Sequence, residues 1–454
     1  MQASHKVSAV FDDPNLIGSA SLVPVLRLAE RAGLHDLLAA HVSVASPNAA
    51  VKAAGVVAGM LAGADSIDDL DVLRHGGNGR VFTGVRAPST YGTFLRAFTF
   101  GHVRQLDAVA SRTLAGLAGV VPRLLAGTEV MAYVDVDDTI RQVHGYAKQG
   151  AAYGYSGVKG VNAQVAALSS PICAPVIVAA RLRKGNAVSG HGAARLIGDA
   201  VAAARAAGAG GQVMVRADSG YYRQDVIAAA TRANAWFSVT VRMDPAVRQA
   251  ITAIPEPAWT TIRYPRAIWD EQEQRWVSEA QVAETTFTAF TSHPKKRQVS
   301  CRLVVRRVPR LGRATIAAAA AGQDELFTTW RHHGFVTNSA LATVAADETH
   351  RDHAIIEQVI AELKDGPLAH APSGAFQANA AWLALGCLAF NLLHAAGAAA
   401  SARHAKARWA TLRTHLITVP ARIAYSARSL VLHLPTDWPW APAWQDLWAT
   451  ATTP

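Results

Sequence analysis

Three carboxylates stand at the end of an otherwise apolar run, MAYVDVDDTI, at Asp135, Asp137 and Asp138. The apolar residues before them predict a β-strand that ends at the acids. Clustered carboxylates are ligands that hard divalent cations prefer. Because side chains alternate along a strand, Asp135 and Asp137 share one face, and spacing alone leaves open which of them would bind a metal.

Two chemistries fit this pattern. The letters match hhhhDxDxT, the nucleophile motif of haloacid-dehalogenase-like phosphatases, and they also match the first metal ligand of an RNase H-like nuclease. The phosphatase would need a later Lys and a GDxxxD-type acidic pair, but SGYYRQD after Asp218 holds no such pair at the right spacing. The strands that follow Asp137 also depart from the helix-first order of that fold. The phosphatase is therefore kept as the weaker alternative.

The order of elements favours the nuclease. From residue 129 the periodicity predicts β-β-β-α-β-α-β, with strands in VMAYVDV, NAQVAAL, APVIVAARL, QVMVRA and WFSVTVRM. This is the order of the RNase H-like fold, in which the first and fourth strands lie side by side. Asp137 ends the first strand and Asp218 the fourth, so we expect the two carboxylates to meet and to bridge a hard divalent cation.

A long helix is predicted in LATVAADETHRDHAIIEQVIAELKDG, closed by Gly366. Its spacing places His350, His353, Glu357 and Lys364 near one face. Such a polar stripe is usually a solvated face. Here the helix follows a core that lacks a third acid, and Glu357 would supply one.

Aromatic and basic residues alternate through a strand-rich stretch from about Pro255 to Arg313. Aromatic rings interleaved with cations suit stacking on bases and binding of phosphates, although any one of these tryptophans would fit a buried role equally well. The residues concerned are Trp259, Trp269, Trp276, Lys295, Lys296 and Arg297.

The first 125 residues or so are predicted to be helical by their 3.6-residue periodicity. In APSTYGTFLRAF, Pro88 and Ser89 or Thr90 supply a helix start and N-cap. Arg96 and Arg104 make this helix a candidate for DNA contact, and an ordinary surface helix fits as well.

The charge balance favours a polyanionic partner. The chain has 44 Lys+Arg against 33 Asp+Glu, a formal net charge of +11, and nucleic acid is the commonest polyanion. The three cysteines lack CxxC spacing, which fits a reducing cytoplasm, and the N-terminus lacks a signal-peptide pattern. One apolar stretch, Ala381–Ala400, is long enough to span a bilayer. It contains Asn391 and His394, so we expect a buried core helix and no membrane association.

Several separated blocks, in order and over nearly the whole chain, resemble the DDE transposases of bacterial insertion sequences, specifically the family numbered thirteen-eighty. They are DDPNLIGSASLVPVLRLAERAGL, DVDDTIRQVHGYAKQGAAYGYSGVKG, RADSGYY, FTTWRHHGFVTN, HRDHAIIEQVIAELKDG, ANAAWLALGCLAFNLL and RIAYSARSLVLHLPTDWPW.

The resemblance implies that Asp137, Asp218 and Glu357 are the catalytic and metal-binding acids, with Asp135 as the alternative first ligand. Asp138 stands where a small hydroxyl residue is common. Related enzymes carry Y-x2-R-x3-E-x6-K on the last helix. This chain keeps Glu357 and Lys364 but has His350 and His353 in place of Tyr and Arg, and a neutral imidazole is no substitute for a permanent bidentate cation.

The resemblance also implies an α/β fold: an RNase H-like core with a β-rich insertion between the second Asp and the Glu, plus an N-terminal helical domain. The expected boundaries are 1–125 for an end-binding helical region, 126–254 for the first part of the core, 255–335 for the insertion and return strands, and 336–454 for the rest of the core and a helical tail.

The implied activity is cut-and-paste movement of double-stranded DNA with terminal inverted repeats into target DNA. It would use two Mg²⁺ or Mn²⁺ ions, in a homodimer or larger complex on nucleoid DNA in the cytoplasm. An insertion tryptophan would receive a flipped base. The histidine substitutions keep a second interpretation open, a degenerate relative that binds DNA without cutting it.

Overall fold

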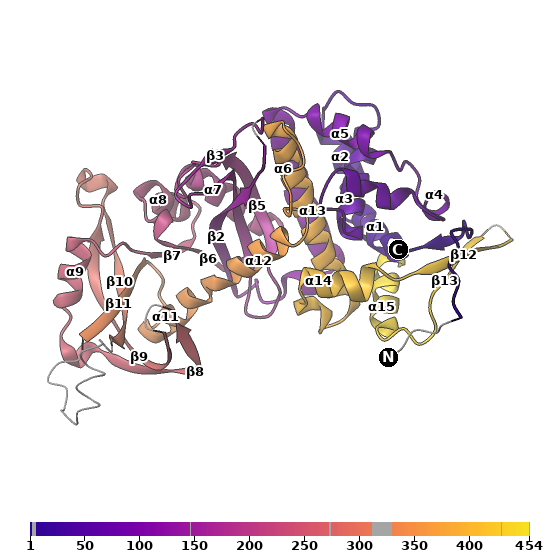
Figure 1. The fold of residues 1–454 in the computed structure, drawn as a ribbon. Helices are drawn as coiled ribbons and strands as arrows, with labels where there is room; N and C mark the ends of the chain where they lie inside the picture. The colour runs from indigo at the N-terminus through magenta and orange to yellow at the C-terminus, as the bar shows by residue number, and fades with distance from the viewer. Residues whose placement is uncertain (2–5, 146, 272–273, 311–328, 428, 454) are drawn as a thin grey trace.

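The computed structural model describes residues 1–454 except 2–5, 146, 272–273, 311–328, 428 and 454. Figure 1 shows an elongated molecule, with a strand-rich end, a central α/β region and a helical end that holds both termini. The predicted start of the FTTWRHHGFVTN strand, at 327–328, lies outside the described residues.

A mixed sheet forms the centre. Its order is β3-β4-β2-β6-β7-β11-β10-β9-β8. Strand β5 also pairs with β4, on the edge that faces away from β2 and next to the short strand β3. As predicted, the first and fourth long strands are neighbours: β2 and β6 pair in parallel, while β2 and β4 pair antiparallel. The strands of this region are β2 (Met131–Gln142), β3 (Ala152–Tyr153), β4 (Lys159–Ser169), β5 (Val176–Lys184), β6 (Gln212–Ala217) and β7 (Trp236–Thr240).

The apolar side chains of the central strands are buried under helices on both faces of the sheet. β4 is buried along nearly its whole length on both faces, and α7 and α12 both pack against β2 and β4. The helices in and beside this region are α7 (Ala193–Ala206), α8 (Gln224–Arg232), α9 (Pro245–Thr252), α11 (Thr343–Arg351) and α12 (Ile355–Lys364).

The strand-rich stretch after residue 255 continues the central sheet. β11 pairs antiparallel with β7, and β10, β9 and β8 follow outward in turn. The strands are β8 (Thr260–Asp270), β9 (Arg275–Ala289), β10 (Val299–Arg310) and β11 (Thr329–Thr337).

The N-terminal helices pack against the C-terminal ones, and α6 and α13 lie side by side next to the core sheet (Figure 1). By length and composition α13 could cross a membrane, but 94% of its most apolar window is buried inside the protein. This helix is therefore a core helix, as predicted. These elements are α1 (Leu22–Arg31), α2 (Leu34–His41), α3 (Ala49–Ala62), α4 (Asn78–Val81), α5 (Pro88–Arg96), α6 (Phe100–Val120), α13 (Phe376–Ala400), α14 (Trp409–Leu412) and α15 (Ala441–Thr452).

A smaller three-stranded sheet joins the two ends of the chain, in the order β1-β12-β13. Strand β1 pairs antiparallel with β12, so residues near the N-terminus are held by residues near the C-terminus. Its strands are β1 (Leu16–Ile17), β12 (Ala421–Ser426) and β13 (Ser429–His433).

Two helix predictions need correction. The helix predicted over LATVAADETHRDHAIIEQVIAELKDG is divided by a 3-10 turn, η6 (Asp352–Ala354), into α11 and α12. The tighter turn changes the angle between successive side chains, so the predicted single polar face is broken between His350 and Glu357. In α5, Pro88 does occupy the first turn, but the N-cap is Ala87, without a side-chain hydrogen bond.

Candidate active site

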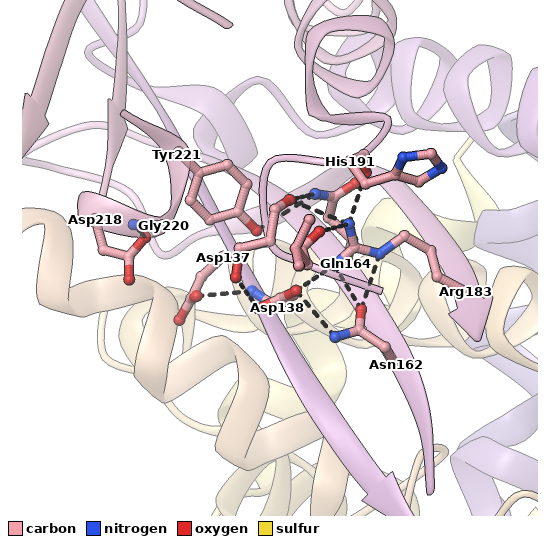
Figure 2. Close-up of polar contacts among 11 residues, drawn as sticks. Asp137, Asp138, Asn162, Gln164, Arg183, His191, Asp218, Gly220 and Tyr221 are labelled. Atoms are coloured by element: carbon pink, nitrogen blue, oxygen red, sulfur yellow. Dashed lines mark hydrogen bonds and ion pairs between the residues drawn. The ribbon is translucent and has the colours of Figure 1, made fainter. Parts of the chain in front are cut away.

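Asp137 and Asp218 lie side by side where β6 ends next to β2. The first strand was predicted to end at Asp137, but β2 continues to Gln142 because β4 still pairs with it there. The register pairs Val136 with Ala217, so the next residue on each strand is one of these aspartates. Figure 2 shows both carboxylates at the edge of a polar network. The Asp138 N–H donates to Asp137 Oδ1 at 2.7 Å, and the Gly220 N–H donates to Asp218 Oδ1 at 3.0 Å.

Burial and mutual repulsion disfavour charge on this pair. Burial raises the pKa of Asp137 to about 6, and the negative charge of Asp218 adds to the effect. Burial also raises the pKa of Asp218. Among the residues that the structure describes, neither carboxylate has an Arg or Lys partner within ion-pair distance. Two adjacent, partly desolvated acids without a cation suit a divalent metal ion.

Asp138 faces the other side of β2 and is neutralised there. Arg183 of β5 forms an ion pair with its Oδ2. The Asn162 side chain donates to the same oxygen at 2.9 Å, and the Ser189 hydroxyl donates to Oδ1 at 3.1 Å (Figure 2). Arg183 also donates to the carbonyls of Val188, Ser189 and His191. Asp138 thus holds the strand and the 188–191 loop together.

Asp135 is also occupied, by a second arginine. Arg216 donates to both of its carboxylate oxygens, at 2.6 and 2.7 Å, and both residues are almost completely buried. Burial opposes ionisation, but the Arg216 charge and the His353 ring outweigh it and hold the pKa of Asp135 below its usual range. Of the two acids that the sequence left as alternatives, Asp137 is the one beside Asp218 without a cationic partner.

Sequence reasoning missed both arginines. Arg216 was visible as the residue two positions before Asp218, and Arg183 as a cation at the end of a predicted buried strand. A basic side chain inside a strand that is buried on both faces is a signal for a buried acidic partner.

The predicted third acid comes from another element. Glu357 lies in the first turn of α12, which packs against β2, and its side chain is exposed. Within the described part of the chain, no three His, Cys, Asp or Glu side chains are gathered closely enough to hold a metal ion. The structure thus brings Asp137 and Asp218 together and places Glu357 on the neighbouring helix.

The two histidines of the predicted signature point inward. His350 contacts the hydroxyls of Ser238 and Thr240, at 2.8 and 3.0 Å, and its ring stacks on Phe335. His353 Nδ1 lies 3.4 Å from Asp135 Oδ1. Both ring nitrogens of His350 are therefore hydrogen-bonded within the protein. Lys364, the other residue of the predicted signature, lies at the end of α12 and is half-buried.

The three predicted tryptophans fall into two groups. The Arg307 guanidinium lies over the Trp259 ring at 4.1 Å and over the Trp330 ring at 4.3 Å, so Trp259 belongs to a packed cluster. Trp269 and Trp276 face each other across β8 and β9 with ring centroids 5.5 Å apart, and 42% and 66% of their surfaces are exposed. The second group is free to contact a partner.

The basic cluster Lys295–Arg297 forms the short turn η5 between β9 and β10. Its three side chains are exposed, and Arg297 donates to the Gln224 side chain at 3.1 Å. The cluster therefore lies on the same side of the molecule as the start of α8, which follows Asp218 along the chain.

Comparison with known protein families identifies a family whose name includes the DDE acids, the residue types proposed for this site. The family model described as Transposase DDE domain group 1 matches residues 2–452. No curated protein matches the chain.

Proposed function

Because the chain belongs to the Transposase DDE domain group 1 family, a family of nucleases and strand transferases that move DNA, we propose that it is the transposase of a bacterial insertion sequence of the family numbered thirteen-eighty. It binds terminal inverted repeats and cuts and joins DNA in the cytoplasm, as a homodimer or larger complex. One observation supports this most: Asp137 and Asp218 lie together without a cationic partner, whereas Asp135 and Asp138 each have an arginine.

Carboxylate oxygens suit Mg²⁺ or Mn²⁺, and the proposed site would use two such ions once Glu357 comes closer to Asp137 and Asp218, because the three are not gathered among the described residues. Asp137 and Asp218 offer carboxylate oxygens from adjacent strands, and Glu357 of α12 supplies the third carboxylate. When bound, such ions lower the barrier to attack on an anionic phosphodiester by activating the nucleophile and stabilising the leaving oxygen. A carboxylate pair whose charges repel each other also gains most from a bound cation.

The chain's own residues orient the DNA and the acids. Arg183 and Arg216 anchor Asp138 and Asp135, the neighbours of Asp137 on β2. Lys364 and the Lys295–Arg297 turn provide cations for backbone phosphates. After the first cut, a freed 3′-hydroxyl that takes the place of water would attack target DNA by the same chemistry, so one site performs both steps.

The test is metal-dependent cleavage of DNA that carries the inverted repeats beside the protein's own gene. We expect cuts at the repeat ends with wild type and losses of roughly 10²–10³-fold for Asp218→Asn and Glu357→Gln, which correspond to about 3–4 kcal/mol of transition-state stabilisation. Glu348→Gln, an exposed glutamate on α11, is the matched control for Glu357.

The alternatives give other outcomes in the same assay. Binding without cutting, in wild type and variants alike, would identify a degenerate DNA-binding relative. If the protein neither binds nor cuts DNA that carries the correct ends, the metal-dependent phosphatase becomes the favoured function. Cleavage that survives in Asp218→Asn would remove this residue from the site.

The exposed pair Trp269 and Trp276 is proposed to receive a flipped base near the cut. Stacking of a base on an aromatic ring contributes about 1–3 kcal/mol, so we expect Trp269→Ala or Trp276→Ala to slow cleavage by roughly 10–100-fold. A mismatched base pair beside the cut, which costs less to open, would restore part of the rate. Trp259→Ala should mainly lower the melting temperature. Unchanged cleavage in all three variants would remove the hypothesis.

A further inference from the structure

A groove of about 660 Å³ opens where the N-terminal helices meet the end of β2. Its walls are the start of η1 (Asp68–Arg74), one face of α5 along its length, the loop after β2, and the segment between α12 and α13. The lining includes three cationic side chains, Arg96, Arg141 and Lys148, and one carboxylate, Asp68. The groove is therefore electropositive in its lining.

Arg141 links this groove to the active site. It follows Asp137 by four residues on β2, and the pairing of β2 with β4 runs without a bulge from Tyr133 to Gln142. Alternation therefore places Arg141 on the same face of the strand as Asp137. At about 3.3 Å per residue the two lie about 13 Å apart along the strand.

Within the described residues, the Arg141 side chain has no hydrogen-bond or ion-pair partner. Its Nε is buried without a hydrogen-bond acceptor, and among the described residues no carboxylate pairs with it. A guanidinium without a carboxylate partner keeps its charge and its terminal N–H donors available to an anion in the groove. Asp65 at the groove's margin is already paired with His370, at 2.9 Å.

The other two cations are placed to assist. Lys148 donates to the carbonyl of Ala371, which fixes its ammonium group at the groove wall. Arg96 is exposed at the end of α5 and makes one hydrogen bond, to the Thr93 hydroxyl at 3.3 Å. Both keep donors available for an anion.

We propose that this groove binds backbone phosphates of the DNA strand beside the scissile bond, with Arg141 as the central contact. The inference rests on the proposed function and names a part of its substrate. A separation of about 13 Å corresponds to about four base pairs at 3.4 Å each. The planar guanidinium fork of Arg141 matches a phosphate, and Lys148 and Arg96 add charge along the same path.

The experiment measures binding without catalysis. Fluorescence anisotropy of a duplex that carries the inverted repeat and its flank is recorded in EDTA over a range of salt concentrations. We expect Arg141→Gln to weaken binding about tenfold, as expected for one charge-assisted contact. The slope of log affinity against log salt should fall by about 0.9. Arg141→Lys should retain most of the slope. Arg112→Ala, an exposed arginine on α6 outside the groove, is the matched control.

Shortened duplexes locate the contact. Wild type should lose affinity when the flank is cut back past about four base pairs from the cleavage site, whereas Arg141→Gln should be insensitive to that step. Arg96→Ala, a change at an exposed position, repeats the salt test should Arg141→Gln fold poorly, with a smaller loss of affinity expected.

Two failures are distinguishable. If wild type cuts at the repeat ends while the Arg141 and Arg96 variants bind with unchanged affinity and salt slope, the groove proposal is wrong and the proposed function stands. If wild type binds the duplex with the expected Arg141 effect but does not cut with Mg²⁺ or Mn²⁺, the groove proposal stands and catalysis does not. A wild type that does not bind overturns both.

Discussion

Asp137→Asn should abolish DNA cleavage and at the same time make the metal-free protein more stable. The cleavage loss follows because an amide is a poor substitute for a charged ligand of a divalent cation, and we expect a loss of roughly 10³-fold. The stability gain follows because burial and Asp218 penalise the Asp137 charge in the folded state. The Asp138 N–H would keep an oxygen acceptor at the asparagine side chain.

The pH dependence has a definite sign. The pKa of Asp137 is about 6 when folded, against an ordinary 3.8. The folded state therefore holds this proton more tightly, and its stabilising contribution is fully present below about pH 4 and lost as the pH rises through 6. Ionised Asp137 costs on the order of 3 kcal/mol at pH 7. Asp137→Asn should recover this cost at pH 7 and recover none at pH 4.

Thermal unfolding in EDTA measures the gain, which should raise Tm by a few degrees, about 2–4 °C. Added Mg²⁺ or Mn²⁺ should raise Tm for wild type and not for Asp137→Asn, because only the former has the ligand. Asp36→Asn on α2, an exposed carboxylate, is the matched control and should change neither quantity. A variant that still cuts, or that melts below wild type at pH 7, would contradict the assignment.

The sequence predicted what depends on local pattern. Apolar strand patterns indicated β2, β4, β5, β6 and β7 in the right order, and that order predicted Asp137 beside Asp218, as the structure has them. The buried nature of α13 followed from two polar residues in an apolar run, Asn391 and His394, and both are buried.

Long-range pairings were beyond the sequence. Asp135 and Asp137 looked equivalent as first ligand because nothing nearby in the sequence shows that Arg216 neutralises Asp135. The pairing of Asp138 with Arg183 was equally hidden from the sequence. The 3-10 turn at Asp352–Ala354 was missed for a similar reason. Neither proline nor glycine marks it, and it lies where Arg351 pairs back to Asp347 at 3.0 Å.

We propose that the buried Asp135–Arg216 ion pair positions the proposed catalytic residues. Each partner stands two residues before a proposed catalytic aspartate, and the register sets Asp135 directly opposite Arg216. Arg216 also donates to the carbonyl of Thr349 at 2.6 Å, and thereby joins α11, the helix that leads to Glu357, to β2 and β6. One buried guanidinium thus connects β2, β6 and α11, the helix that precedes α12 and its Glu357.

Arg216→Met should lower the free energy of unfolding by about 3–5 kcal/mol, because it leaves Asp135 buried and without its cation. The double variant Asp135→Leu/Arg216→Met removes both charges and should regain most of that loss, since apolar residues often replace a buried ion pair at little cost. Urea unfolding of the wild type, both single variants and the double variant measures the coupling.

The rate of DNA cleavage by the double variant shows whether the ion pair positions the proposed catalytic acids or only stabilises the fold. In the double variant the carbonyl of Thr349 and the ring of His353 lose their charged partners even though the core is refilled. We therefore expect the double variant to be nearly as stable as wild type but at least about tenfold slower in cleavage, since small misplacements of reacting groups are costly. Restored stability together with full cleavage would mean that the ion pair serves the fold alone. A slow but stable enzyme would mean that Arg216 holds Asp137, Asp218 and the helix of Glu357 in register.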